Sequence, residues 1–197
     1  MPGRGRTGGG ARHDHGVRFF DDFPGHVERR LPDGASGPPS GMIGGFVPWR
    51  TTLVRTHNAW AAVQDFEAFP SGILFELVAR VEDWDPDPSA RTHTLLGHPT
   101  SLRLGVRFSD GRAGATDRFA ERARPMRLGE VIFFPKGGSG HPHEYRHAFW
   151  LWPLPPPGPM TWICVWPAVG VGEETVEVDA SELVESAASS ERLWTEV

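Results

Sequence analysis

The chain has 197 residues, a formal net charge of −5 and a hydrophobic fraction of 39%. This length suits one domain with its own core, and the acidic balance argues against general nucleic-acid binding, which favours a basic domain. The single cysteine, Cys164, excludes an intramolecular disulfide and a cysteine-based zinc site. No apolar run predicts a transmembrane helix, and the first residues lack the apolar stretch of a signal peptide, so we expect a cytoplasmic protein.

The first part of the chain differs in composition from the rest. Residues 1–41 are rich in Gly, Arg and Pro and hold few residues that could form a core, which predicts a disordered tail. An apolar cluster at 17–23 interrupts this tail and is either a short docking motif or a segment that folds back on the domain. The character changes at Phe46, and we therefore expect the folded domain to span residues 46–197.

Alternation of apolar and polar residues predicts a series of short strands after Phe46. The clearest case is 101–108, where the even-numbered residues are apolar while Arg103 and Arg107 face the other way. A long loop is expected over 82–100 and a flexible Gly-rich loop over 136–143. The predicted strands before the second loop are 49–55, 59–69, 73–81, 101–108, 113–119 and 130–134.

Residues 144–167 give the strongest hairpin signal in the sequence. Two runs of aromatic and β-branched residues flank a proline-rich connection at 154–159. We expect two central antiparallel strands that place Trp150 opposite Trp162. A last strand at 175–178 precedes a helix at 180–192, which Asp179 would open through a capping-box pair with Glu182.

Many short strands, Gly and Pro punctuation and a single terminal helix define the expected fold class. Helices between strands, which a βαβ fold requires, are not predicted. The sequence therefore favours a mostly β protein, an antiparallel β-sandwich of the immunoglobulin-like or jelly-roll-like kind, with one C-terminal helix.

Four tryptophans on the two central strands are the first candidate surface. Even spacing puts each pair on one face of its strand, and an exposed aromatic strip would contact a protein partner or stack on a sugar. The alternative, which we favour, is that they form the core, because one face of the sheet must be buried. These residues are Trp150, Trp152, Trp162 and Trp166.

Two further patterns suggest charged sites. Arg103 and Arg107 share one strand face, and with the arginines that follow they would attract an anion or a partner; an ordinary solvated face is the alternative. The spacing of Asp83, Asp85 and Asp87 resembles a calcium loop, although Pro88 stands where that motif requires Gly. A polar turn built from Asp-Pro pairs is the simpler interpretation of this loop.

Catalytic and metal chemistry have weak support in the sequence. Cys164 lies between apolar residues of a strand, which predicts a buried and inert thiol. Asp65 and Glu67 alternate on a strand, where carboxylates usually face water. The histidines at 141, 143 and 147 are close in sequence but have no evident acidic partner for a metal site.

The stretch FWLWPLPPPGPMTWICVWPAVGV, with the Gly-rich loop before it and AVQDFEAFPSGILFELVARV, resembles a group of actinobacterial hypothetical proteins. The WPLPPPGP run is the most specific element, and the resemblance extends from about Phe46 to the C-terminus. It implies no catalytic residues and no cofactor. It also implies that the N-terminal tail is an addition to the common domain.

We therefore predict a noncatalytic β-sandwich module that binds another protein through an apolar surface. A sandwich that binds a small ligand, carbohydrate or calcium, is the first alternative. A hydrolase of unknown substrate is the second. No membrane contact is expected.

Overall fold

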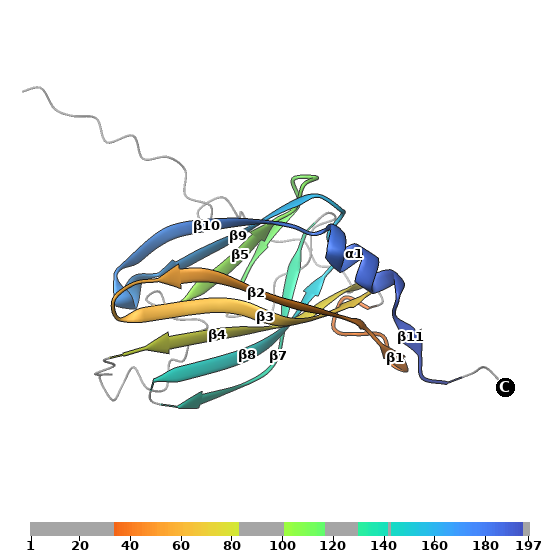
Figure 1. Cartoon of the computed structure of the whole chain (residues 1–197), viewed down its shortest axis with the longest axis horizontal. Helices are drawn as coiled ribbons and strands as arrows, with labels where there is room; N and C mark the ends of the chain where they lie inside the picture. Colours follow the sequence, from red (N-terminus) through yellow and green to blue (C-terminus); the bar gives the residue numbers. More distant parts are fainter. Residues whose placement is uncertain (1–33, 83–100, 117–129, 142, 195–197) are drawn as a thin grey trace, which may run out of the picture.

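The computed structural model describes residues 34–82, 101–116, 130–141 and 143–194. Within these ranges the chain forms two main antiparallel sheets, a short two-stranded sheet and one α-helix (Figure 1). The predicted fold class, a mostly β antiparallel sandwich with one C-terminal helix, is confirmed. No helix among these residues is long and apolar enough to cross a membrane.

The larger sheet has five strands, and each strand is antiparallel to its neighbours. The strand order is β2 (Gly45–Arg55), β3 (Ala59–Phe69), β4 (Gly72–Val81), β8 (Glu144–Trp152) and β7 (Ile132–His141). The four-stranded sheet has the order β10 (Val171–Asp179), β9 (Pro159–Trp166), β5 (Arg103–Arg107) and β6 (Ala113–Ala115).

The two sheets form the layers of the sandwich and approach each other at both edges. At one edge β10 lies beside β2, and at the other β6 lies beside β7. The backbone N–H of Val131 donates to the carbonyl of Ala113 (3.2 Å), which joins the second pair of edges. The arrangement is therefore a flattened, barrel-like sandwich.

The predicted hairpin over 144–167 is wrong. Its two strands exist, but β8 pairs with β4 and β7 while β9 pairs with β5 and β10, so the two lie in different sheets. The proline-rich residues 153–158 carry the chain from one layer to the other (Figure 1). Proline lacks the N–H that a tight hairpin would use, and two strongly apolar strands bury more surface face to face than edge to edge.

An aromatic cluster fills the space between the layers. The Trp162 ring of β9 lies 5.2 Å from Phe75 and 6.3 Å from Phe66, measured between ring centroids. Phe133 and Phe149 complete the cluster from β7 and β8. All five rings are buried, and burial of each large side chain contributes roughly 2–3 kcal/mol to stability.

Helix α1 (Ser181–Ala188) is shorter than predicted and packs on β2 and β3 through Leu183 and Ala187. The predicted capping box does not form. Asp179 instead accepts a hydrogen bond from the Ser181 backbone N–H (2.9 Å). The side chain of Glu182 accepts one from the Trp49 indole of β2 (2.6 Å), which fastens the helix to the larger sheet.

The predicted domain boundaries and one predicted loop also differ from the structure. Residues 34–41, expected to belong to a tail, lie on the larger sheet, and Ala35 is fully buried there. The expected Gly-rich loop forms most of β7 instead, because cross-strand pairing with β8 outweighs the low strand propensity of glycine. The remainder of the predicted tail and the predicted loop at 82–100 lie largely outside the described residues.

Two short elements were not predicted. Strand β1 (Met42–Ile43) pairs with β11 (Glu191–Arg192) and brings the end of the described chain beside residue 41. A single turn of 3-10 helix, η3 (Pro167–Val169), connects β9 with β10. The β1–β11 pair and α1 lie together at one end of the sandwich (Figure 1).

Candidate functional site

Three of the four candidate tryptophans are buried and form no exposed strip. Trp162 and Trp166 belong to the core between the sheets, as the favoured interpretation predicted. Trp150 lies on the outer face of the larger sheet, where residues 34–41 cover it; its indole N–H donates to the Gly34 carbonyl (2.9 Å). Trp152 is half-buried. The hypothesis that this set forms a partner or sugar-binding surface is therefore wrong for three of its members.

Arg103 and Arg107 lie on the outer face of β5, as the alternation predicted. The intervening Leu104 and Val106 are core residues. Arg107 is exposed and Arg103 half-buried, and both make further interactions. Arg112 forms an ion pair with Asp110 (2.6 Å) in the turn after β5, so it contributes no free charge to an anion site.

The calcium hypothesis rests on Asp83, Asp85 and Asp87, which lie outside the described residues. Among the residues that the structure does describe, no three His, Cys, Asp or Glu side chains are grouped as metal ligands. His141 is exposed and His147 faces inward, and no described residue joins them to form a three-ligand metal site.

Cys164 is buried in the core, as predicted. Burial, with a smaller contribution from nearby Glu174, raises the pKa of its thiol to about 12. Because the thiolate is the nucleophile, this cysteine is inert at neutral pH.

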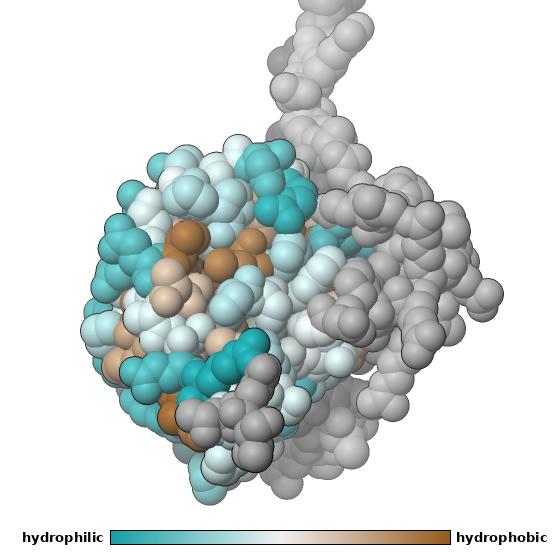
Figure 2. Space-filling view, turned by 90° about the vertical axis from the view of Figure 1, so that its right-hand side faces the viewer, coloured by the Kyte–Doolittle hydropathy of each residue, from teal (hydrophilic) through white to brown (hydrophobic). Residues whose placement is uncertain are grey.

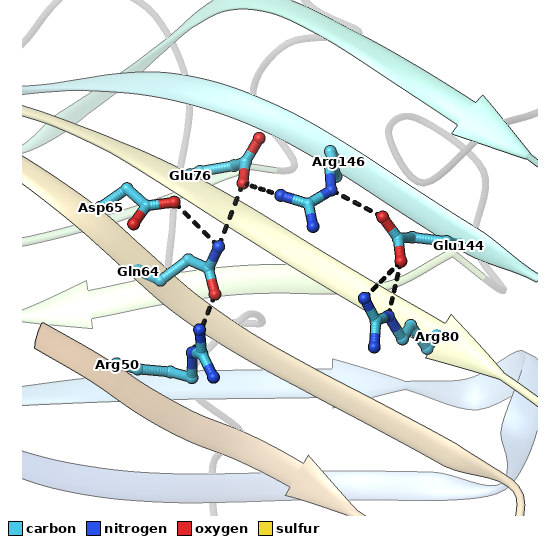
Figure 3. Close-up of polar contacts among 7 residues, drawn as sticks. All are labelled: Arg50, Gln64, Asp65, Glu76, Arg80, Glu144 and Arg146. Atoms are coloured by element: carbon cyan, nitrogen blue, oxygen red, sulfur yellow. Dashed lines mark hydrogen bonds and ion pairs between the residues drawn. The ribbon is translucent and has the colours of Figure 1, made fainter.

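A polar network crosses the outer face of the larger sheet (Figure 3). Gln64 is its first branching point: its side-chain oxygen accepts from Arg50 (3.0 Å), and its amide donates to Asp65 (2.8 Å) and Glu76 (3.3 Å). Gln64 and Glu76 stand opposite each other on β3 and β4. A bulge in β3 holds Asp65 in the left-handed region (φ 55°), and so places its carboxylate beside the amide of the preceding residue.

Arginine and glutamate side chains extend the network to β8. Arg146 donates to Glu76 (2.8 Å) and to Glu144 (2.6 Å), and Arg80 donates to the second oxygen of Glu144 (2.6 Å). The Arg80 guanidinium also lies 5.9 Å from the ring centroid of Trp60, within cation–π range. The network thus joins β2, β3, β4 and β8.

The network is electrically balanced, with three arginines against three carboxylates. The hydrogen bond from Arg146 lowers the pKa of Glu144, and the two carboxylate partners raise the pKa of Arg146. A catalytic base needs a carboxylate with a pKa near the working pH, whereas the Glu144 carboxylate is held ionised by two guanidinium groups. The arrangement is typical of cross-strand side-chain pairs that stabilise one strand register.

Tyr145 and His147 lie on the inner side of β8, at the end of the sheet that is remote from α1. Their rings are nearly parallel (5°), and the tyrosine hydroxyl is 3.4 Å from Nδ1 of His147. The His147 ring also contacts core residue Phe149, with centroids 4.6 Å apart. Its Nε2 is buried without a hydrogen-bond partner, and burial lowers the pKa of the imidazole.

An apolar surface lies at the opposite end of the molecule. Four large hydrophobic side chains on β1, β2 and the end of the described chain are between 46% and 73% exposed. The β1–β11 pairing places them at the end that carries α1. Figure 2 faces this end and shows hydrophobic residues at the surface among hydrophilic ones. We call these four residues the apolar end: Ile43, Phe46, Leu193 and Trp194.

Comparison with known proteins gave no matching family model, no similar curated protein and no similar solved structure. The site assignment therefore depends on the geometry of this chain.

Sequence patterns missed both the network and the apolar end. Ile43 and Trp194 lie in segments too short to show periodicity, and only the β1–β11 pairing brings them together. The alternation over 73–81 did place Glu76 and Arg80 on the outer face, but their partners on β3 and β8 follow from strand register.

Proposed function

We propose that this protein is a noncatalytic β-sandwich module that binds another protein through the apolar end. The observation that supports the proposal most is the exposure of Trp194 (73%) and Phe46 (65%), the two most exposed large hydrophobic side chains among the described residues. Exposed apolar clusters of this kind mark interaction sites, and tryptophan and phenylalanine supply much of the binding energy at such sites.

The charge around the apolar end indicates the chemistry of the partner. The described residues of 171–194 contain seven acidic side chains and a single arginine. Glu182 and Glu185 lie on α1 and Glu191 lies on β11, at the same end of the molecule as the apolar residues. A partner with apolar side chains inside a basic rim would complement this surface. A second copy of the same chain would bring two acidic rims together, which disfavours self-association.

Two groups that a hydrolase could use are unsuited to catalysis, which weighs against the hydrolase alternative. The Cys164 thiol has a pKa of about 12, and the carboxylate of Glu144 is paired with two arginines. We also propose that the protein acts in the cytoplasm, because one buried cysteine and no disulfide suit a reducing compartment. Its relation to the actinobacterial group that it resembles stays a prediction.

The proposal is tested by native mass spectrometry of the tagged protein purified gently from its own host. We expect extra mass that matches a polypeptide, and we expect the Phe46→Ser/Trp194→Ser double variant to lose it. Arg55→Ser, an exposed substitution at the far end of β2, is the matched control and should retain the partner.

Salt provides a second measurement on the same complex. Raising the ionic strength should weaken it, because the acidic rim is exposed and its charges are screened. A wild-type protein that stays a bare monomer or forms a homodimer would overturn the proposal. So would a complex that survives in the double variant.

A further inference from the structure

The described chain begins close to the apolar end. Phe46 on β2 is in register with Glu67 on β3, and Glu67 is in register with Leu74 on β4. Leu74 stands opposite Trp150 on β8, whose indole donates to the Gly34 carbonyl. Three strand spacings, roughly 14 Å, therefore separate Phe46 from the row position at which the described chain starts.

Residues 34–41 carry the chain from this point to the apolar end itself. The backbone N–H of Leu193 donates to the Gly41 carbonyl (2.8 Å). A Cβ atom on Gly41 would lie 3.2 Å from Cδ1 of Trp194, so the indole packs closely over the backbone there. The residues that precede Gly34 are thus attached to the domain at the end that exposes Trp194.

The sequence before Gly34 contains one apolar cluster, VRFFDDF at 17–23, which lies outside the described residues. Phe20, at its centre, is 14 positions before Gly34. A chain of that length can reach up to about 46 Å, well beyond the distance to Phe46. A tether of this kind gives its segment an effective concentration on the order of 1 mM at a site that it can reach.

Charge also favours this segment as an occupant. Glu182, Glu185 and Glu191 are exposed at the same end of the molecule as the apolar residues. Residues 1–18 contain four arginines against one aspartate, and Arg18 directly precedes two phenylalanines. Basic residues beside aromatic ones complement an apolar surface with acidic surroundings. The two aspartates within the cluster oppose this attraction, so apolar contacts must supply most of the affinity.

We propose that residues 17–23 bind the apolar end of the same molecule and compete there with the partner protein. Phe19, Phe20 and Phe23 cover the exposed rings, and Arg18 faces the acidic side chains. This regulation rests on the proposed function, because it needs a partner to exclude. A contact with a dissociation constant of roughly 0.2 mM would be closed in about five molecules of six and would weaken the partner about sixfold.

The first test measures the exposure of Trp194 in the full-length protein without a partner. The protein is labelled with 5-fluorotryptophan, and Trp194→Phe identifies the fluorine signal of that residue. A soluble gadolinium chelate relaxes exposed groups, and we expect it to relax Trp194 at least about twofold faster in the Phe19→Ser/Phe20→Ser/Phe23→Ser variant than in the wild type. Val27→Ser, an apolar substitution outside the cluster, is the matched control and should behave as the wild type does.

The second test supplies the segment as a separate molecule. A fluorescent peptide of residues 12–24 is titrated with full-length protein, and binding is followed by anisotropy. The triple phenylalanine variant should bind it about sixfold more tightly than the wild type, whose own segment competes. Adding Phe46→Ser and Trp194→Ser to that variant should abolish binding, whereas adding the exposed Arg55→Ser should leave it unchanged.

Three results would overturn the proposal. They are equal relaxation of Trp194 in the wild type and the triple variant, a peptide that does not bind, and binding that survives the loss of Phe46 and Trp194. Protection of Trp194 that increases with protein concentration would also overturn it, in favour of a second copy of the chain. These measurements use the purified protein alone. Capture of a host polypeptide by the triple variant would therefore uphold the proposed function even where the intramolecular contact fails.

Discussion

The indole N–H of Trp150 donates a 2.9 Å hydrogen bond to the carbonyl oxygen of Gly34, a residue 116 positions earlier in the chain. Trp150 is completely buried on the outer face of the larger sheet, with the Phe69 ring in edge-on contact (5.6 Å). Residues 34–41, which the composition assigns to a tail, thus pack over a buried tryptophan. The domain consequently includes residues 34–41.

Trp150→Phe should destabilise the fold by about 1–3 kcal/mol, because the substitution leaves the Gly34 carbonyl without its partner and removes part of a buried ring. The free energy of unfolding is measured by urea denaturation. Trp152→Phe, at a half-buried position on the same strand, is the matched control and should cost less. Equal stability of the two variants would show that the hydrogen bond contributes nothing.

Gly45 permits close packing of α1 on β2. A Cβ atom there would lie 2.0 Å from the carbonyl oxygen of Ser186, a backbone atom that cannot move without shifting the helix. We therefore expect Gly45→Ala to cost about 1–3 kcal/mol through overpacking. Gly172→Ala is the control, since a Cβ atom at that position has open space around it. Thermal unfolding should show a large decrease in Tm for the first variant and almost none for the second.

Stability should depend on pH through His147. Its pKa is lowered in the folded state by burial, so the unfolded chain binds this proton more readily than the native protein does. The contribution of neutral His147 to the free energy of unfolding is therefore complete above the unfolded pKa of about 6.5. It decreases as the pH falls toward the folded pKa. Denaturation curves at pH 7.5 and 5.5 should show a smaller difference for His147→Gln than for the wild-type protein. An unchanged difference would contradict the assignment.

The Cys164 thiol should be unreactive while the protein is folded. With a pKa of about 12, only on the order of one thiol in ten thousand is ionised at pH 8, and burial hinders access further. Ellman's reagent should react slowly with the native protein and rapidly in denaturant. Rapid labelling under native conditions would mean that β9 opens far more readily than its central position implies.

The polar network should favour the observed strand register but add little to the free energy of unfolding. Glu76 and Arg146 are partly exposed, and surface ion pairs contribute about 0–1 kcal/mol. A double-mutant cycle with Glu76→Gln and Arg146→Met should give a coupling energy within that range. High salt should reduce it. A coupling of several kcal/mol would indicate that the pair is shielded from solvent much more than its exposure suggests.

Local patterning predicted the fold class and much of the strand content. The alternation of Ile73, Phe75 and Leu77 with Glu76 identified the buried face of β4 correctly, because a side-chain period of two is an intrinsic property of a strand. The same pattern on β5 separated Leu104 from the two arginines. These inferences need no knowledge of which strands become neighbours.

Pairing partners could not be predicted in the same way. The sequences of β8 and β9 fit an edge-to-edge hairpin and a face-to-face crossing equally well, because both strands are apolar. As a result, Trp150 is covered by residues 34–41, whereas Trp162 lies in the core between the sheets. A strand was predicted over 130–134, but its Gly-rich continuation in β7 was missed, because that part is stabilised by pairing with β8 and not by its own composition.

The crossing at residues 153–158 has a consequence for how the chain folds. Strand β4 is separated from its neighbour β8 by 62 residues (82–143), and β5 is separated from its neighbour β9 by 51 residues (108–158). A chain emerging from the ribosome therefore holds β4 and β5 as open edges until the last third has been made. Folding should be slow and limited by these distant pairings, and chaperone assistance should matter most during that interval.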